Sequence, residues 1–465
     1  MARIAVVGGG IAGLAAAYAL QHGLQEGRAV GVTLIEAAPR LGGKILTERV
    51  GGFLIEGGPD SFLTLKPQAV QFARALGLGD RLVPTGRPRH VFILHRGRLH
   101  PLPDGLTSLV PRRLGPFLRS DLFSIREKAR FAWDLLVPPN RNGSDETIGA
   151  FVRRRLGPAA VERLAGPLLA GIHAGDVEAL SLRATFPTLA EAEIRYGSLT
   201  RAVVARRRSV TGVDGEAAMF MTLAGGLQEL VDRVVTALQA VVLRTGTRAL
   251  SLERRARGYR VILEGGEEVE ADAVILATPA NVAAALLRDV NEAASRLAAD
   301  IPYASTAAVA LGFRRPDVAH PLVGHGYVVA SSEAMLHTAC TWVSSKWPGR
   351  APPDHVLLRC FVGRAGRSAG LELADDVLVR RLLAELAPLL GLRGDPVLAR
   401  VYRWPASMPQ YTVGHLERLR ALRAALAGTP GLFMAGGGYE GVGLPDCIRQ
   451  GQEAAAAALA SASPP

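Results

Sequence analysis

Three glycines and one acidic residue near the N-terminus have the types and the spacing needed to bind a dinucleotide. Gly8, Gly10 and Gly13 lie between a short apolar strand and a helix, and Glu36 ends the next strand. Gly8 permits a tight turn, Gly10 lets the backbone approach a pyrophosphate, and Gly13 lets the helix pack closely on the sheet. The helix N-terminus offers free N–H groups to phosphates, and Glu36 can accept hydrogen bonds from ribose hydroxyls while disfavouring a 2′-phosphate. The motif predicts dinucleotide binding; the alternative is a glycine turn with a structural role only.

The residues that follow Glu36 favour FAD over NAD. Arg40-Leu-Gly42-Gly43-Lys44 places two basic side chains around a second glycine pair. A second close backbone approach suits FAD, which is long and binds in an extended form, with Arg40 and Lys44 near its phosphates. We therefore expect a flavin cofactor.

A second glycine-rich turn precedes the last helix. The strand at 432–435 is followed by Gly441-Val-Gly443 and by a helix from about Asp446. The N-terminus of that helix can face the pyrimidine ring of a flavin and stabilise negative charge on the reduced cofactor. The alternative is an ordinary strand-to-helix turn. Because the chain begins and ends with strand–glycine–helix elements, we expect one domain to be built from both termini.

The composition describes a globular protein with excess positive charge. The chain has 465 residues, 49% of them hydrophobic, and a net charge of +12, which predicts two or three structural units. The charge suits nucleic acid, an anionic membrane or a polyanionic small substrate, or reflects an overall bias towards arginine. The tightest basic run, Arg206–Arg208, lies in an expected loop without a nucleic-acid motif. Nucleic acid is therefore not expected as a partner.

The cysteines and the apolar segments indicate a cytoplasmic protein. Cys340, Cys360 and Cys447 have neither metal nor disulfide spacing, which fits a reducing compartment. The first twenty residues resemble a signal peptide superficially, but their glycine spacing argues against one. No stretch reaches the ~18 apolar residues that a membrane span needs. The sequence predicts a soluble or peripheral protein.

The pattern of elements predicts a mixed fold class, α/β and α+β. A Rossmann-type GxGxxG domain is expected beside a mixed-sheet substrate domain and a helical insert. Ser124-Ile-Arg-Glu127 has the form of a capping box at the head of one insert helix. Later strands are expected at 259–263, 273–276, 327–330 and 356–362. The expected divisions are 1–67, 220–291 and 402–465 for the cofactor domain; 68–79, 179–219 and 292–401 for the substrate domain; and 80–178 for the helical insert.

Several segments together resemble one enzyme family. The Glu36–Gly43 pattern is similar to that of the amine oxidase, carotenoid desaturase and porphyrinogen oxidase flavoenzymes. The whole chain resembles the oxygen-dependent, FAD-containing porphyrinogen oxidases of haem synthesis, most closely the coproporphyrin-forming Gram-positive type. The segments that carry this second resemblance are 55–62, 167–176, 338–342, 346–348, 403–415 and 440–448.

The resemblance implies a flavin-borne oxidation. A coproporphyrinogen III oxidase removes six electrons from its substrate, two at a time, in hydride-type steps, and O2 reoxidises FAD with release of H2O2. No catalytic side chain and no metal is expected, since the protein mainly orients the ring and tunes the flavin. The alternatives are a protoporphyrinogen IX oxidase, an amine oxidase or carotenoid desaturase, and a flavin-binding regulator without turnover.

The resemblance also implies residue roles. Trp404 is carried over as a flavin neighbour and Ala249 as a backbone contact to the adenine. Lys66 matches a lysine that the family places at the substrate pocket, or is a surface lysine before a proline. Phe361 stands where tyrosine is usual, so no role of that hydroxyl is transferred. The expected cofactor-binding residues are Gly8, Gly9, Gly10, Ile11, Ala12, Gly13, Glu36, Ala37, Arg40, Gly43, Lys44, Gly58, Pro59, Asp60, Ser61, Ala249, Trp404, Gly441, Val442, Gly443 and Leu444.

Partners are implied in the same way. They are the porphyrinogen, O2, the inner face of the cell membrane as a peripheral contact, and the next haem-pathway enzyme as a receiver of product. Relatives touch membranes with the helical insert, and the basic residues of 80–178 suit an anionic surface.

Overall fold

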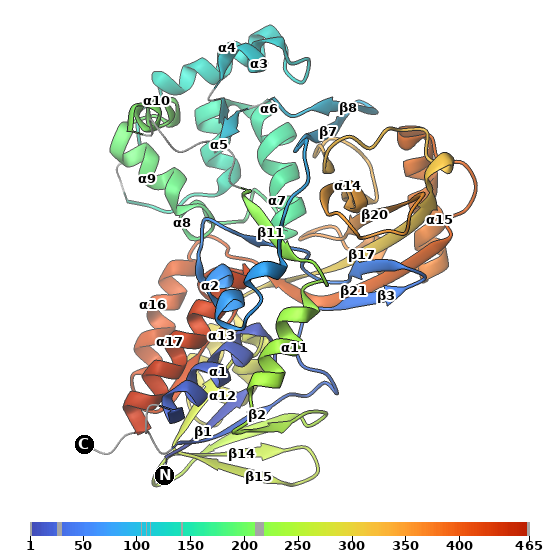
Figure 1. The fold of residues 1–465 in the computed structure, drawn as a ribbon. Coiled ribbons are helices and arrows are strands. Elements are labelled where there is room, and N and C mark those ends of the chain that lie inside the picture. The colour runs from blue at the N-terminus through green and yellow to red at the C-terminus, as the bar shows by residue number, and fades with distance from the viewer. Residues whose placement is uncertain are drawn as a thin grey trace.

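The two ends of the chain fold together around a parallel sheet (Figure 1). The computed structural model describes residues 2–25, 30–103, 105–107, 109–111, 113–140, 143–209 and 218–462. The sheet has five parallel strands; the three inner ones are largely buried, which explains their mostly apolar sequences, whereas the edge strand 241–244 is partly exposed. Their order is β12 (Val241–Arg244), β2 (Val30–Ile35), β1 (Ala2–Val7), β16 (Ala273–Leu276) and β22 (Leu432–Met434).

Helices cover one face of this sheet, and a second layer covers the other. The first and last helices pack so closely that a Cβ built on Gly451 would stand 2.1 Å from the carbonyl oxygen of Ala12. The covering helices on that face are α1 (Ile11–Gln25), α2 (Gln68–Ala75), α11 (Gln228–Ala237) and α17 (Leu444–Ala462). The other face meets an antiparallel sheet and three helices: β13 (Ala249–Arg254), β14 (Tyr259–Leu263), β15 (Glu268–Ala271), α12 (Ala280–Leu287), α13 (Glu292–Ala299) and α16 (His415–Leu426).

A mixed seven-stranded sheet forms the second part of the molecule. Helix α15 (Asp375–Leu390) buries its leucines against one face. The other face carries the side chains of Leu357, Arg359 and Phe361 and turns towards the parallel-sheet domain, where Leu357 packs on Phe53. The strand order is β21 (Leu398–Pro409), β17 (Tyr303–Arg314), β20 (His355–Val362), β19 (His337–Trp342), β18 (Gly326–Val329), β7 (Val91–His95) and β8 (Arg98–Pro101).

Helices form a third part, at the top of Figure 1. The predicted capping box is confirmed, since Glu127 N–H donates to Ser124 Oγ and Ser124 N–H donates to the Glu127 carboxylate. The helical turns of this part are α3 (Leu114–Arg119), α4 (Ile125–Ala132), η2 (Trp133–Leu135), α5 (Ile148–Leu156), α6 (Pro158–Ala160), η3 (Val161–Ala165), α7 (Gly166–His173), α8 (Leu182–Thr185), α9 (Pro187–Tyr196) and α10 (Leu199–Ser209).

Short elements connect the three parts. Strand β11 pairs with both β5 and β6. The connecting elements are β3 (Thr47–Val50), β4 (Phe53–Glu56), β5 (Phe62–Leu63), η1 (Gly79–Arg81), β6 (Leu82–Pro84), β9 (Leu106–Thr107), β10 (Val110–Pro111), β11 (Phe220–Leu223), η4 (Arg315–Asp317), α14 (Val343–Lys346) and η5 (Ala369–Glu372). No helix in the described part of the chain has the length and apolar character that crossing a membrane requires.

The structure differs from the sequence-based division in three places. Strands β7 and β8 lie within the segment expected to be a helical insert, yet they extend the mixed sheet, because β7 pairs with the distant β18. Helices α8 to α10, expected in the substrate domain, pack instead into the helical core. The prediction of a loop at Arg206–Arg208 is wrong, because these residues belong to α10. Their side chains lie outside what the structure describes.

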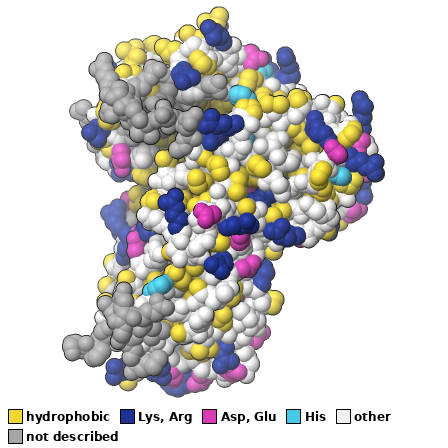
Figure 2. All heavy atoms as spheres, viewed as in Figure 1, with side chains coloured by type: hydrophobic (Ala, Val, Ile, Leu, Met, Phe, Trp, Pro, Cys, Tyr) yellow, Lys and Arg dark blue, Asp and Glu magenta, His cyan; other side chains and the backbone are white. Residues whose placement is uncertain are grey.

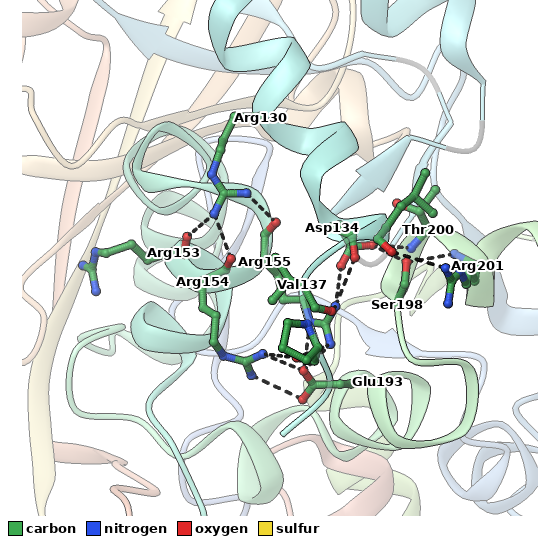
Figure 3. A network of polar contacts seen from close by, with 12 residues as sticks. Arg130, Asp134, Val137, Arg153, Arg154, Arg155, Glu193, Ser198, Thr200 and Arg201 are labelled. Atoms are coloured by element: carbon green, nitrogen blue, oxygen red, sulfur yellow. Dashed lines mark hydrogen bonds and ion pairs between the residues drawn. The ribbon is translucent and has the colours of Figure 1, made fainter. Parts of the chain in front are cut away.

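Buried charges hold the helical part together (Figure 3). The fully buried Arg155 of α5 lies 3.2 Å from Asp134 of η2 and also donates to Glu193 of α9. The second oxygen of Asp134 accepts from the Ser198 hydroxyl and from the Thr200 N–H, both at 2.7 Å. A single network thus connects η2, α5, α9 and the start of α10. Each charge in it is satisfied, which is the condition under which buried ions are tolerated.

We expect Asp134→Ala to lower the free energy of unfolding by about 3 kcal/mol, because it leaves the buried Arg155 short of one anion and frees two donors. Urea unfolding followed by the fluorescence of the adjacent Trp133 measures the loss. The control is Arg380→Ala, which breaks an exposed pair with Asp376 and should cost about 0.5 kcal/mol or less. Equal losses in the two variants would contradict a structural role for the network.

Candidate functional site

The first glycine loop has open space at one glycine and close backbone contact at another. Gly8 has φ +109°, and a Cβ built on Gly13 would stand 1.8 Å from the Gly8 carbonyl oxygen. A Cβ built on Gly10 would meet nothing within 4 Å. Gly8 and Gly13 are therefore required by the fold. Gly10 instead leaves an open cradle at the start of α1, which a side chain at this position would fill.

Glu36 connects this loop to the end of β2. Its carboxylate accepts hydrogen bonds from the N–H groups of Gly9 at 2.7 Å and Ala38 at 2.8 Å. A carboxylate has about four acceptor positions, so two remain for a ligand. The segment that leads to Ala249 lies beside it, since Thr247 N–H donates to the Glu36 carbonyl. Glu36 and the start of β13 thus border the same end of the loop.

The second glycine pair packs directly on the first loop. Gly42 N–H donates to the Gly9 carbonyl at 2.8 Å, and a Cβ on Gly43 would lie 3.1 Å from Gly10 Cα. Arg40 donates to the carbonyls of Gly43 and Ile45, so its guanidinium braces the turn.

Lys44 extends from this turn towards β21. Its ammonium donates to the Ser407 carbonyl, and burial lowers the pKa of Lys44. The structure therefore places the cationic groups of both Arg40 and Lys44 on backbone carbonyls, and their contact with phosphates stays a prediction.

The segment from Gly57 to Ser61 is held from two sides. A Cβ on Gly58 would lie 1.8 Å from the Lys44 carbonyl oxygen. From the mixed sheet, Trp404 Nε1 donates to the Gly57 carbonyl at 2.8 Å and Arg359 donates to the Gly58 carbonyl. The backbone here is fixed between the two sheets.

Asp60 is the charged centre of this segment. It lies 2.9 Å from Lys346 Nζ and accepts from Trp347 Nε1 at 3.1 Å. Burial would raise the pKa of Asp60, but Lys346 and Arg359 hold it well below its usual range. Asp60 is thus a permanent anion whose charge is balanced by its neighbours.

The C-terminal glycine loop is pinned by Tyr411. The Tyr411 hydroxyl donates to the Gly437 carbonyl at 2.6 Å and accepts from Gly441 N–H at 2.9 Å. Burial raises the pKa of Tyr411, so the hydroxyl keeps its proton. Gly441 has φ +98°, and a Cβ there would collide with Asp446. Tyr411 therefore fixes the turn that leads into α17.

Lys66 lies at the rim between α7 and α17. Its ammonium is 2.7 Å from both carboxylate oxygens of Asp446, in the first turn of α17. Burial, and then the charge of Lys66, lower the pKa of His173 to about 4. Lys66 is thus paired with a carboxylate and lies near the end of α7.

The predicted residues come together at the carboxyl edge of the parallel sheet. The contacts Gly9–Gly42, Lys44–Ser407, Gly57–Trp404 and Lys66–Asp446 join four segments that are distant in sequence. Sequence reasoning assigned no role to Arg359, although a lone arginine in the otherwise apolar strand β20 was a usable signal.

Comparisons with known proteins show the family of the chain. Residues 11–459 match the family described as flavin containing amine oxidoreductase. The chain belongs to this family. Within it, the chain is 39% identical to "Coproporphyrinogen III oxidase" of Bacillus subtilis, covering 98% of both chains. It is 37% identical to the protein of the same name from Propionibacterium freudenreichii, covering 97% of this chain and 90% of that protein.

Two solved structures extend the comparison. A structure described as a putative protoporphyrinogen oxidase from Exiguobacterium superposes with a TM-score of 0.87 at 35% identity, covering 99% of both chains. Putrescine oxidase, with a TM-score of 0.68 at 18% identity and 99% coverage of both chains, shares the fold alone. The predicted fold class and the prediction of a flavin-dependent oxidoreductase are confirmed. A flavin fits the residues present, because the cradle at Gly10 is open and Glu36 keeps acceptor capacity.

We expect Gly10→Val to fold normally but to bind flavin about tenfold more weakly or worse, because the new side chain fills the cradle and removes charge-assisted hydrogen bonds to the cofactor. Flavin absorbance per mole of purified protein and the melting temperature report the two properties. Gly115→Val in α3 is the matched control, since a Cβ there also meets nothing within 4 Å. A full flavin content in Gly10→Val would show that Gly10 does not line the cofactor site.

Proposed function

We propose that this protein is an FAD-dependent coproporphyrinogen III oxidase of haem biosynthesis. It would remove six electrons from coproporphyrinogen III to form coproporphyrin III, with O2 as oxidant and H2O2 as product. The observation that supports this best is the full-length similarity, at 33–39% identity, to three enzymes with that name. Lys66 beside the site adds a cation suited to a substrate with four propionates.

FAD is the form of flavin that we propose. Its pyrophosphate would lie at the Gly8–Gly13 loop, with Gly9, Ile11 and Ala12 contributing backbone contacts to it. The ribose would meet Glu36 and Ala37, and the adenine would meet Ala249. The remaining cofactor contacts are proposed for Arg40, Gly43, Lys44, Gly58, Pro59, Asp60, Ser61, Trp404, Gly441, Val442, Gly443 and Leu444.

The bound flavin would supply a two-electron acceptor that O2 regenerates. The chain's own residues would position the ring system. Arg359 and Trp404 hold the Gly57–Gly58 backbone rigid, and Tyr411 holds the Gly441 turn, so both sides of the cofactor would meet fixed backbone. The pKa of His173, about 4, keeps its imidazole neutral at working pH. Positioning of the substrate is thus the main contribution that we assign to the protein.

Protoporphyrinogen IX oxidation is the second candidate. It is favoured by the 30% identity to "Protoporphyrinogen oxidase 1, chloroplastic" of Arabidopsis thaliana, over 97% of this chain and 86% of that protein. An amine oxidase is less favoured, because the similarity to putrescine oxidase is only 18%.

We expect the purified, FAD-loaded protein to convert coproporphyrinogen III to a fluorescent porphyrin in air, with a higher kcat/KM than for protoporphyrinogen IX. Porphyrin fluorescence and peroxide release follow the two reactions, and protein stripped of flavin is the blank. No FAD-dependent oxidation of either substrate would refute the proposed function. A preference for the dicarboxylate would support the second candidate.

We also propose a cytoplasmic location with peripheral membrane contact through the α3–α4 patch, defined as Leu114, Leu118, Ile125, Trp133 and Leu136. These side chains are exposed, Ile125 by 85% and Leu136 by 71%. Figure 2 shows hydrophobic and basic side chains side by side over this end of the molecule. Exposed apolar side chains flanked by Lys and Arg suit the interface of an anionic bilayer. Transfer of product to the next haem-pathway enzyme stays a prediction.

We expect the protein to sediment with vesicles containing phosphatidylglycerol at low salt, and the double substitution Ile125→Asp with Leu136→Asp to abolish most of this binding, because each adds a charge to the apolar patch. Leu250→Asp, at an exposed hydrophobic residue of the other part of the molecule, is the control and should bind like the original. Sedimentation that both variants leave unchanged would exclude the α3–α4 patch.

A further inference from the structure

In the described part of the chain, the two arginines that follow β20, Arg364 and Arg367, form no ion pair with a carboxylate. Arg364 N–H donates to the Arg367 carbonyl at 3.1 Å, and Arg367 N–H donates to the Arg364 carbonyl at 2.9 Å. This tight turn brings two guanidinium-bearing residues together. Within the described residues, neither guanidinium forms an ion pair or a side-chain hydrogen bond. Burial lowers the pKa of Arg364, and the charge of Arg367 lowers it further. Two positive charges are thus close together here, with Asp176 near Arg364 but not in an ion pair with it.

The Arg364–Arg367 turn is attached to the rim of the site. Ala365 N–H donates to the carbonyl of Ala174, the residue that ends α7. The preceding residue, His173, feels the charge of Lys66. Arg364 itself lies close enough to Asp176 for that carboxylate to raise its pKa, but too far for an ion pair. The short segment that follows α7 therefore lies between Lys66 and Arg364.

The sheet connects this turn to the cofactor region. On β20, Arg359 contacts the Gly58 carbonyl, and its guanidinium lies 4.7 Å from the centre of the Phe361 ring on the same face of the strand. Arg364 comes three residues after Phe361. The strand ends at Val362, so the arginine turn continues directly from the strand whose Arg359 and Phe361 side chains face the cofactor segment.

We propose that Arg364, with Arg367 beside it, is a carboxylate-binding subsite for one propionate at the edge of the macrocycle. The inference rests on the proposed function and names the residues that bind a carboxylate of its substrate. Arginine suits this task because its planar fork binds a carboxylate through two parallel hydrogen bonds. Lys66 is already paired with Asp446, whereas the two arginines form no ion pair among the described residues and can form one with the ligand.

The test measures binding of the product, coproporphyrin III, by equilibrium dialysis with FAD-loaded protein. Arg364→Ala should weaken this binding about 10- to 100-fold, the loss expected when one charge-assisted contact to a carboxylate is removed. Arg364→Lys should give an intermediate loss, because it keeps the charge without the fork. Arg288→Ala, at an exposed arginine of α12's C-terminal end, is the matched control and should bind like the original.

Coproporphyrin III tetramethyl ester serves as the uncharged probe. Its binding should be the same in the original protein and in Arg364→Ala. An equal loss for ester and acid would overturn the subsite, because it would mean that Arg364 supports the fold and not the carboxylate. A loss in Arg364→Ala no larger than in Arg288→Ala would overturn it too.

The binding test separates this inference from the proposed function. Oxidation of coproporphyrinogen III together with unchanged binding in Arg364→Ala would reject the subsite alone. Absence of oxidation together with an Arg364-dependent affinity for the tetracarboxylate would reject the function and leave the subsite standing. Should Arg364→Ala be recovered unfolded, Arg367→Ala replaces it, with a smaller loss expected because Arg367 is more exposed.

Discussion

Backbone packed directly on backbone, without any side chain between, is the constraint on which the site depends. It occurs where Gly13 lies against Gly8, where Gly58 lies against Lys44, and where Gly451 lies against Ala12. At each of these three contacts a Cβ would stand about 2 Å or less from a carbonyl oxygen, which no side chain can tolerate without moving the chain. These contacts bring the first helix, the cofactor turn and the last helix into one assembly. Their common result is that backbone segments from both ends of the chain lie directly against one another.

Charge in this assembly is neutralised almost entirely by the chain itself. Arg40 and Lys44 end on carbonyl oxygens, Lys346 pairs with Asp60, and Lys66 pairs with Asp446. These contacts hold the charged groups in place, since each of these cations already has an anionic or carbonyl partner. The arginines after β20 differ from them, because they form no ion pair among the described residues. The paired cations chiefly hold the segments of the site together, whereas these arginines keep their charge available to a ligand.

Much of the candidate site could be predicted from the sequence because its parts are local motifs. Gly8 to Gly13, Glu36 and the Gly441 turn are each marked by the residue types of a short stretch of sequence, so strand, turn and helix patterns were sufficient to locate them. The same holds for the capping box at Ser124. Local patterns cannot, however, show which distant segment a short element joins. The apolar run of β7 had no visible reason to pair with β18, and the apolar residues of α9 and α10 fit either core equally well. Arg359 was missed for a related reason, because its value depends on the Gly58 carbonyl opposite.

The order of strands in the parallel sheet has a consequence for how the protein is made on the ribosome. Strand β1 is central: one edge pairs with β2, which follows it closely, and the other with β16, which begins at Ala273. Strand β22 and helix α17 arrive only at the end of the chain. During synthesis the second edge of β1 stays unpaired until more than half of these residues have emerged, and the face later covered by α17 stays uncovered until residues 444–462 have emerged. In a chain with this topology, the domain whose synthesis begins first is therefore the last to be completed.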